Sequence, residues 1–235
     1  MNRSVAIVTG ATLGIGRATS FALAEAGFAI GVTARTADRV AALVADLRAA
    51  GHEAAGIAAD VSDPAEVAAF VAQVTRDLGP VEILVNNAGI IVPKPFTDTT
   101  LDDWDRTFAV NVRSLFLVTQ GVLPGMRERG RGDIVNVASL AGKNGVANAV
   151  AYAASKHAVL GFAKSLMLEV RKDGIRVMSV CPGSVDTPMM RGQGTMQPNF
   201  DRILGAEDVA AAIVAAVRLP RRAMMSEIDL RPSNP

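Results

Sequence analysis

The stretch "VAIVTGATLGIGRA", residues 5–18, decides the fold of this chain. Its first residues form an apolar run that predicts a strand, and a turn containing Gly10, Gly14 and Gly16 leads into an Ala-rich segment that predicts a helix. Glycines in such a turn allow a tight bend and close backbone approach, and the helix N-terminus offers N–H donors to an anion. The turn therefore predicts a dinucleotide-binding site, with an ordinary strand-to-helix turn as the alternative.

Short apolar runs alternate with longer Ala-rich stretches over the rest of the chain. The runs are "FAIGVTA" (28–34), "AAGIAAD" (54–60), "VEILVNNAG" (81–89), "GDIVNVAS" (132–139), "GIRVMSVCPG" (174–183) and "SEIDLRP" (226–232). Strands covered on both faces read as continuous apolar runs, and their alternation with helices is typical of a parallel sheet. We therefore expect one α/β domain over residues 1–235, a Rossmann-type doubly wound parallel sheet of about seven strands with helices on both faces. The longest helical segments are expected at 101–129 and 149–172.

Composition excludes several classes of function. The net charge is +1 and half of the residues are hydrophobic, so the chain has a globular composition and no electrostatic case for nucleic acid or an anionic membrane. No apolar run is long enough to span a bilayer, and the N-terminus lacks the apolar region of a signal peptide. We expect a soluble, cytoplasmic protein with neither a nucleic-acid nor a membrane partner.

Cysteine and histidine are scarce. Cys181 is the only cysteine, which excludes an intrachain disulfide, and it follows an apolar run, so we expect a buried, inert thiol. The two histidines, His52 and His157, belong to no Cys/His cluster, so we expect no metal site.

Polar residues follow two of the predicted strands. Asp60 ends the third apolar run, and "VNNAG" places Asn87, Ala88 and Gly89 after the fourth. The carboxyl ends of parallel strands form the crevice in which ligands bind, and a carboxylate there could accept a hydrogen bond from an adenine amino group. The alternatives are a helix N-cap for Asp60 and a simple turn for the asparagine pair.

The motifs together resemble the short-chain dehydrogenase/reductase family, in its compact single-domain branch. They are T-G-A-x-x-G-I-G at 9–16, D-V at 60–61, N-N-A-G at 86–89, N-V at 111–112, Ser139, Tyr152-x-x-x-Lys156 and P-G-x-V-x-T at 182–187. The resemblance covers nearly the whole chain in order. It implies an oxidoreductase that transfers a hydride reversibly between a nicotinamide and a carbonyl or secondary alcohol.

The resemblance implies a catalytic set of Asn111, Ser139, Tyr152 and Lys156. Tyr152 is the only tyrosine of the chain, and Lys156 follows it by one helical turn. A neighbouring ammonium, together with the positive nicotinamide when the cofactor is oxidised, favours the phenolate, so the phenol could exchange a proton with a substrate oxygen near neutral pH. The Ser139 hydroxyl would hold that oxygen, and in the family the asparagine steadies a water that passes protons to the lysine.

The resemblance also implies the binding residues. The expected cofactor-binding set is Gly10, Thr12, Leu13, Gly14, Ile15, Gly16, Arg35, Thr36, Asp60, Val61, Asn87, Ala88, Gly89, Tyr152, Lys156, Pro182, Gly183, Val185 and Thr187. The expected substrate pocket contains Leu140, Val146, Asn148 and Met189, with a substrate loop at about 184–205. Because these positions are mostly apolar, we expect a medium-sized hydrophobic ketone, aldehyde or secondary alcohol. The resemblance makes a 3-oxoacyl thioester the leading option, because many compact members of the family reduce one.

The end of the second strand bears on cofactor preference. An NAD-preferring site places a carboxylate there, about 20 residues after the glycine turn, whereas residues 33–36 are Thr, Ala, Arg and Thr. Arg35 could pair with the 2′-phosphate of NADP(H) through charge-assisted hydrogen bonds. We therefore expect NADP(H) to be favoured over NAD(H). Leu13, where many phosphate-binding relatives carry a second arginine, and Asp38 weaken the case, and a solvated Arg35 is the alternative.

Two segments depart from the family's commonest pattern. The segment after Thr187 is short for a substrate lid, and Met189, Met190, Met196 and Phe200 suggest an adaptable apolar cover, with a disordered surface loop as the alternative. The ending "MMSEIDLRPSNP" replaces a glycine-rich tail that shapes subunit contacts in many relatives. We expect a homodimer or homotetramer.

Two other functions remain open. A non-catalytic NADP(H)-binding sensor could use the same fold, although the intact Asn, Ser, Tyr and Lys set argues against it. An epimerase or dehydratase of the family's longer branch is disfavoured, because its T-G-x-x-G-x-x-G turn and large C-terminal substrate domain are missing.

Overall fold

The computed structural model describes residues 4–192 and 198–233. Seven parallel strands form one sheet in the order β3-β2-β1-β4-β5-β6-β7. The strands are β1 (Val5–Thr9), β2 (Ala29–Ala34), β3 (Ala54–Ala58), β4 (Val81–Asn86), β5 (Gly132–Val137), β6 (Ile175–Pro182) and β7 (Glu227–Leu230). This arrangement confirms the expected doubly wound sheet. The order reverses between β1 and β4, which is where open α/β sheets bind their ligands.

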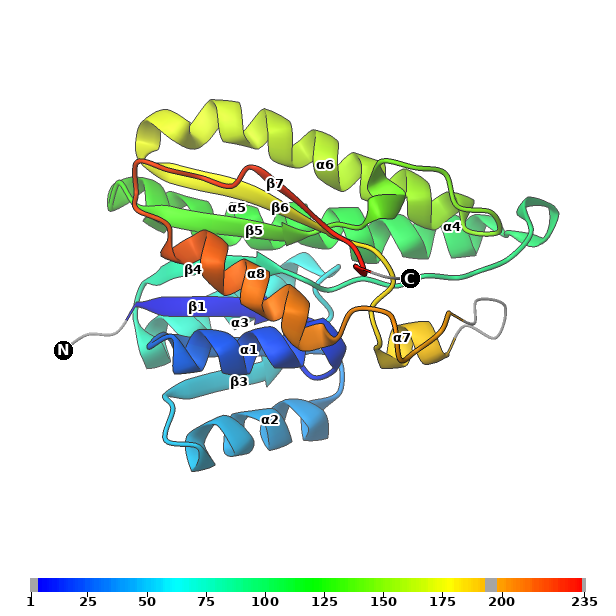
Figure 1. The fold of residues 1–235 in the computed structure, drawn as a ribbon. Helices are drawn as coiled ribbons and strands as arrows, with labels where there is room; N and C mark the ends of the chain where they lie inside the picture. The colour runs from blue at the N-terminus through cyan, green and yellow to red at the C-terminus, as the bar shows by residue number, and fades with distance from the viewer. Residues whose placement is uncertain (1–3, 193–197, 234–235) are drawn as a thin grey trace.

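Helices cover both faces of the sheet (Figure 1). They are α1 (Gly14–Glu25), α2 (Ala37–Ala49), α3 (Pro64–Leu78), α4 (Leu101–Phe108), α5 (Ser114–Glu128), α6 (Val150–Val170), α7 (Pro188–Arg191) and α8 (Ala206–Arg218). Side chains of α1, α2 and α8 join one hydrophobic core, and those of α3, α5 and α6 join a second core on the opposite face. The apolar strands are buried between these two layers, as their sequence pattern predicts.

The helical segment expected at 101–129 is interrupted. A π-helical turn, Ala109–Arg113, separates α4 from α5, so the expectation of one continuous helix is wrong. The turn carries Asn111, which is 2% exposed and hydrogen-bonds the main chain of Ile90. Single π turns inside helices occur frequently at functional sites.

A buried charge cluster fastens the edge of the sheet opposite the strands' carboxyl ends. Arg176 donates two hydrogen bonds of 2.7 Å to the Asp133 carboxylate, and Arg221 donates a third of 2.7 Å. The side chains of Asp133 and Arg176 are 3% and 7% exposed. Arg176 also donates to the carbonyl oxygens of Val217, Leu219 and Ala223, which ties the segment between α8 and β7 to the sheet.

Part of the expected substrate loop falls outside this description. Residues 193–197, which include Met196, are not described, nor are residues 1–3 and 234–235. In the described portion of the loop, Val185 forms a bridge with Leu204, and Thr187 caps the short helix α7. Over residues 4–192 and 198–233, no helix has both the length and the apolar character needed to cross a membrane.

Candidate active site

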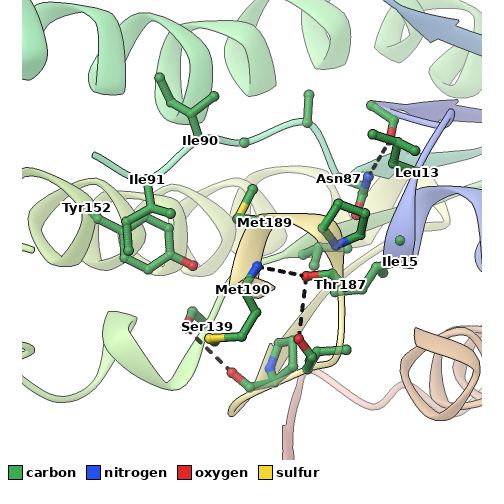
Figure 2. Close-up of a pocket in the computed structure, with 18 of the residues that line it drawn as sticks. Leu13, Ile15, Asn87, Ile90, Ile91, Ser139, Tyr152, Thr187, Met189 and Met190 are labelled. Atoms are coloured by element: carbon green, nitrogen blue, oxygen red, sulfur yellow. Dashed lines mark hydrogen bonds between the residues drawn. The ribbon is translucent and has the colours of Figure 1, made fainter. Parts of the chain in front are cut away.

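A cleft of about 1100 Å³ opens at the carboxyl ends of the strands, and it brings together most of the expected site residues. Of the expected residues, all line the cleft except Gly16, Asn111 and Asn148. Figure 2 shows Tyr152 and Ile91 at one end and Leu13, Ile15 and Asn87 at the other, with Thr187 and Met189 between them. The cleft therefore joins the glycine turn to the tyrosine.

The glycine turn leaves room for a ligand and packs tightly beneath it. A Cβ on Gly14 (φ +48°) would come within 2.9 Å of Thr187 Cγ2, and a Cβ on Gly16 would come within 2.3 Å of the Gly10 carbonyl oxygen. Gly16 thus serves the close packing of α1 and does not line the cleft. Helix α1 begins without a side-chain cap. Its first N–H groups and its dipole are therefore available to bind a pyrophosphate, and the residues of the turn fit a dinucleotide.

Asn87 braces this turn from β4. Its Nδ2 donates to the carbonyl oxygens of Thr9 (2.9 Å) and Gly10 (3.0 Å). In return the Thr9 hydroxyl accepts from the backbone N–H groups of Asn87 (3.0 Å) and Ala88 (3.1 Å). These hydrogen bonds join the asparagine motif to the glycine turn and hold the floor of the cleft at the switch point. The motif is therefore not a simple turn, which was the alternative interpretation.

Two arginines stand where the cleft passes the end of β2. Arg35 and Arg39 both line it, together with Thr36 and Asp60. Asp60 Oδ1 accepts from the backbone N–H (2.9 Å) and hydroxyl (2.7 Å) of Ser62, and these bonds lower the pKa of that carboxyl. Asp60 is not the N-cap of α3, because Asp63 caps that helix. Asp38 does not line the cleft.

Tyr152 and Ser139 lie together at the other end. Ser139 follows β5, accepts from the Ala141 N–H (3.1 Å) and donates weakly to the Pro182 carbonyl oxygen (3.4 Å). Burial raises the pKa of Tyr152, and the adjacent Ser139 hydroxyl opposes that shift. The phenol of the protein alone is therefore protonated at neutral pH.

Lys156 is 5% exposed and held in place. Its Nζ donates to the Val137 carbonyl oxygen (2.8 Å) and lies 5.7 Å from the centre of the Tyr152 ring. Burial lowers the pKa of Lys156 to about 8.

The expected inert thiol, Cys181, is fully buried, and burial raises its pKa to about 11.

Asn111 is buried behind the wall of the cleft, on the π-helical turn. Its Oδ1 accepts from the Ile90 N–H (2.7 Å), and its Nδ2 donates to the Ile90 carbonyl oxygen and to the Ser155 hydroxyl, both at 2.9 Å. A Cβ on Gly89 would lie 3.4 Å from Asn111 Oδ1 and 3.7 Å from Lys156 Nζ. Because residue 89 is glycine, no side chain from this position enters the space beside the amide and the ammonium.

The expected substrate pocket is apolar, as its sequence predicts. Leu140, Val146 and Met189 line the cleft near Tyr152, and Met190 joins them. Asn148 does not line it, because its backbone takes a positive φ of 58° and its carbonyl oxygen accepts from the Lys94 N–H (2.8 Å). Asn148 instead joins the two loops that flank the Tyr152 end.

Several lining residues escaped the sequence analysis. Those with functional side chains are Arg39, Ser184, Asn199, Arg202 and Arg231. Arg39 could have been found, because it follows Arg35 by four residues, the spacing of one helical turn. The others lie on segments whose path over the cleft depends on tertiary contacts. Within the described ranges, no three His, Cys, Asp or Glu side chains gather as a metal site requires.

Comparisons with known proteins agree with this geometry. The family model described as short chain dehydrogenase matches residues 4–198. A protein of Streptomyces violaceoruber named "Granaticin polyketide synthase putative ketoacyl reductase 1" is 44% identical over 212 residues, which cover 86% of this chain and 78% of that protein. Two solved structures are also similar. A variant of actinorhodin polyketide ketoreductase with NADPH has a TM-score of 0.91 and 35% identity, covering 98% of this chain and 96% of the other. A metagenomic short-chain oxidoreductase in complex with NADP has a TM-score of 0.86 and 33% identity, covering 99% and 98%.

The family match spans most of the chain, and the fold corresponds over nearly the whole of two solved relatives. The resemblance noted from the motifs is thereby confirmed, and this chain belongs to the short-chain dehydrogenase/reductase family of oxidoreductases.

Proposed function

We propose that this protein is an NADP(H)-dependent ketoreductase that transfers a hydride reversibly between the nicotinamide and a carbonyl carbon. One observation carries the proposal: a single cleft has the Tyr152, Ser139 and Lys156 side chains at one end and the Arg35 and Arg39 guanidinium groups at the other. A bound NADP(H) would lie along the glycine turn between these ends and would supply or accept the hydride.

Tyr152 is the proton donor in reduction. Because burial raises the pKa of Tyr152, its hydroxyl is protonated at neutral pH and can give its proton to the carbonyl oxygen as negative charge develops there. The Ser139 hydroxyl beside it donates a hydrogen bond to the same oxygen. In oxidation the tyrosine takes the proton back.

Lys156 and Asn111 support this exchange. The Lys156 ammonium, next to the Tyr152 ring, stabilises the phenolate left after proton transfer, and it is charged below a pKa of about 8. Asn111 faces the open space beside the Lys156 ammonium, where a water would connect that group to solvent.

The preference for NADP(H) rests on charge. Arg35 and Arg39 can both reach toward a 2′-phosphate, and the carboxylate of Asp60 is already engaged by Ser62. Two guanidinium groups favour a dianion over the neutral ribose hydroxyl of NAD(H). The NADP and NADPH in the names of the two similar structures are consistent with this choice.

The proposed substrate is a 3-oxoacyl thioester or another apolar ketone. Leu140, Val146, Met189 and Met190 offer an apolar wall beside the tyrosine, and unbranched methionines adapt to varied chains. The ketoacyl reductase and ketoreductase named among the relatives support this choice.

We also propose that the protein works as a homo-oligomer. Helices α5 and α6 expose Phe116 (47%) and Leu168 (57%), and apolar side chains of this size on adjacent helices suit a subunit interface. A dimer through this face or a tetramer built from such dimers would both cover them.

A deuterium-transfer assay tests the function. The enzyme is incubated with NADPH deuterated at nicotinamide C4, in each stereoisomer, and with a panel of 3-oxoacyl thioesters and apolar ketones. We expect one of the two isomers to deliver a single deuterium to the carbinol carbon of the product alcohol, detected by mass spectrometry. Binding of NADPH with no deuterium transfer to any substrate would contradict the proposal and favour a sensor.

A further inference from the structure

The cleft contains more positive charge than hydride transfer needs. Its charged lining residues are Arg35, Arg39, Asp60, Lys156, Arg202 and Arg231. In the proposed function the first two arginines meet the cofactor phosphate and Lys156 serves the tyrosine. Arg202 and Arg231 are left without a role, and Arg231 has the clearer position.

Strand β7 places Arg231 on the substrate side of the sheet. β7 is the edge strand beside β6 (Figure 1), and its residues Ile228 and Leu230 pack into the core on the α1 and α8 face. Alternation along a strand turns Glu227, Asp229 and then Arg231 toward the opposite face. That is the face of α6 and of the 3-10 turn Leu140–Gly142, which begins directly after Ser139.

Contacts at Gly183 join the end of β7 to the substrate pocket. A Cβ on Gly183 would lie 3.3 Å from Leu140 Cδ1 and 3.7 Å from Pro232 Cδ, so Leu140 and Pro232 approach each other across this glycine. The Gly183 N–H also donates to the Leu230 carbonyl oxygen (2.9 Å). Arg231 directly precedes Pro232 and lines the same cleft as Leu140. Because β7 is the edge strand farthest from β2 and β3, Arg231 lies away from the cofactor's phosphate end.

Local charges leave Arg231 in surplus. Along the outer face of β7, Lys143 pairs with both Glu227 and Asp229, and Lys164 pairs with Glu227 at 3.5 Å. Among the carboxylates of residues 4–192 and 198–233, Arg231 approaches only that of Asp229, at 4.0 Å, and its side chain is 61% exposed. These five described side chains comprise three cations and two carboxylates, so their net charge is +1. Of the three cations, Arg231 is the one that lines the cleft.

We propose that Arg231 is a specificity-determining residue that binds an anionic group of the substrate, a carboxylate or a phosphate, located beyond the reacting carbonyl. This inference rests on the proposed ketoreductase function and adds the substrate's charge to it. A guanidinium is suited to both anions because its donors match their paired oxygens. The reacting carbonyl would then meet Tyr152 while the anion holds the far end of the chain at the mouth of the cleft.

The test uses two matched pairs of substrates that differ only in charge. One pair is 3-oxohexanoate and its methyl ester; the other is a 3-oxoacyl thioester of 4′-phosphopantetheine and the same thioester of pantetheine. Steady-state KM and kcat are measured for wild type, Arg231→Gln and Arg231→Lys. Arg222→Gln is the control, because it removes the same charge from the exposed turn before β7, at the opposite end of that strand.

We expect Arg231→Gln to raise KM about ten-fold for the anionic member of one pair, the loss expected for one partly exposed charge-assisted hydrogen bond. KM for its neutral partner and kcat for both should change less than about two-fold by the same reasoning, and Arg231→Lys should recover part of the loss. The pair that responds identifies the anion as carboxylate or phosphate.

Three results would overturn the inference: equal KM changes for charged and neutral partners, no change in either pair, or a matching rise in the Kd of NADPH, which would assign Arg231 to the cofactor. Turnover of the neutral ketones by wild type keeps the proposed function standing in each of these cases. No turnover of any substrate by wild type would instead overturn the proposed function and this inference with it.

Discussion

Replacing Arg35 and Arg39 with glutamine, singly and together, should remove the preference for NADP(H). Both guanidinium groups line the cleft at the end of β2, and both side chains are exposed. A hydrogen bond to a charged group contributes about 1.5–3 kcal/mol, and exposure places these two at the lower end. Each substitution should therefore raise the Kd of NADPH about ten-fold and the pair about a hundred-fold.

The assay is fluorescence titration of NADPH and NADH against wild type, Arg35→Gln, Arg39→Gln and the double variant. The Kd of NADH should stay within about two-fold throughout, because NADH has no 2′-phosphate to lose a contact. Arg76→Gln, on α3 at the other face of the sheet, removes the same charge and should leave both Kd values unchanged. Wild type that binds NADH as tightly as NADPH, or a double variant that keeps its preference, would refute the role of the two arginines.

Four other perturbations follow from the structure. Burial lowers the pKa of Lys156 to about 8, so its ammonium is present below that pH and lost above it; kcat/KM for NADPH should fall above pH 8 in wild type but stay level in Lys156→Arg, and parallel profiles would contradict this. Arg176→Met leaves Asp133 buried with Arg221 as its remaining charged partner, and urea unfolding should show a loss of about 3–5 kcal/mol, whereas a loss below 1 kcal/mol would be inconsistent with a buried pair. Gly14→Ala, whose Cβ would meet Thr187, should weaken NADPH binding more than ten-fold in the same titration; Gly51→Ala, which also has a positive φ but open space around it, should not, and equal effects would point to backbone strain alone. Phe116→Asp with Leu168→Asp should lower the mass measured by sedimentation, whereas Met225→Asp should not, and an unchanged mass would place the interface elsewhere.

The sequence patterns predict most of the fold because they are local. Short runs of apolar residues that alternate with Ala-rich segments indicate the strands, and the spacing of Gly10, Gly14 and Gly16 identifies the crossover at the switch point. The π turn at Asn111 was missed, since it accompanies side-chain bonds to the main chain of Ile90, 21 residues earlier in the chain. No pattern within one helix encodes such a tertiary contact.

The sequence likewise predicts only part of the candidate site. Motif residues such as Ser139, Tyr152 and Lys156 do come together in one cleft, and their catalytic roles remain predictions. The burial that raises the pKa of Tyr152 in the protein alone was not predicted, because one helical turn of spacing shows the nearby ammonium but not how deeply the phenol is buried. Arg231 was overlooked because its place in the cleft depends on the pairing of β7 with β6.

The central claim is that Tyr152 exchanges the proton while the cleft binds NADP(H), and Tyr152→Phe tests it most directly, since the change removes one hydroxyl and keeps the ring. Single-turnover reduction of the best ketone is followed by loss of NADPH absorbance, and NADPH binding is measured on the same preparation. The account predicts a rate at least about a thousand-fold lower than wild type, within the range of general acid catalysis, and a Kd for NADPH within about two-fold of wild type, because the phenyl ring is retained. A Tyr152→Phe enzyme that reduces the ketone at a rate near that of wild type would contradict it.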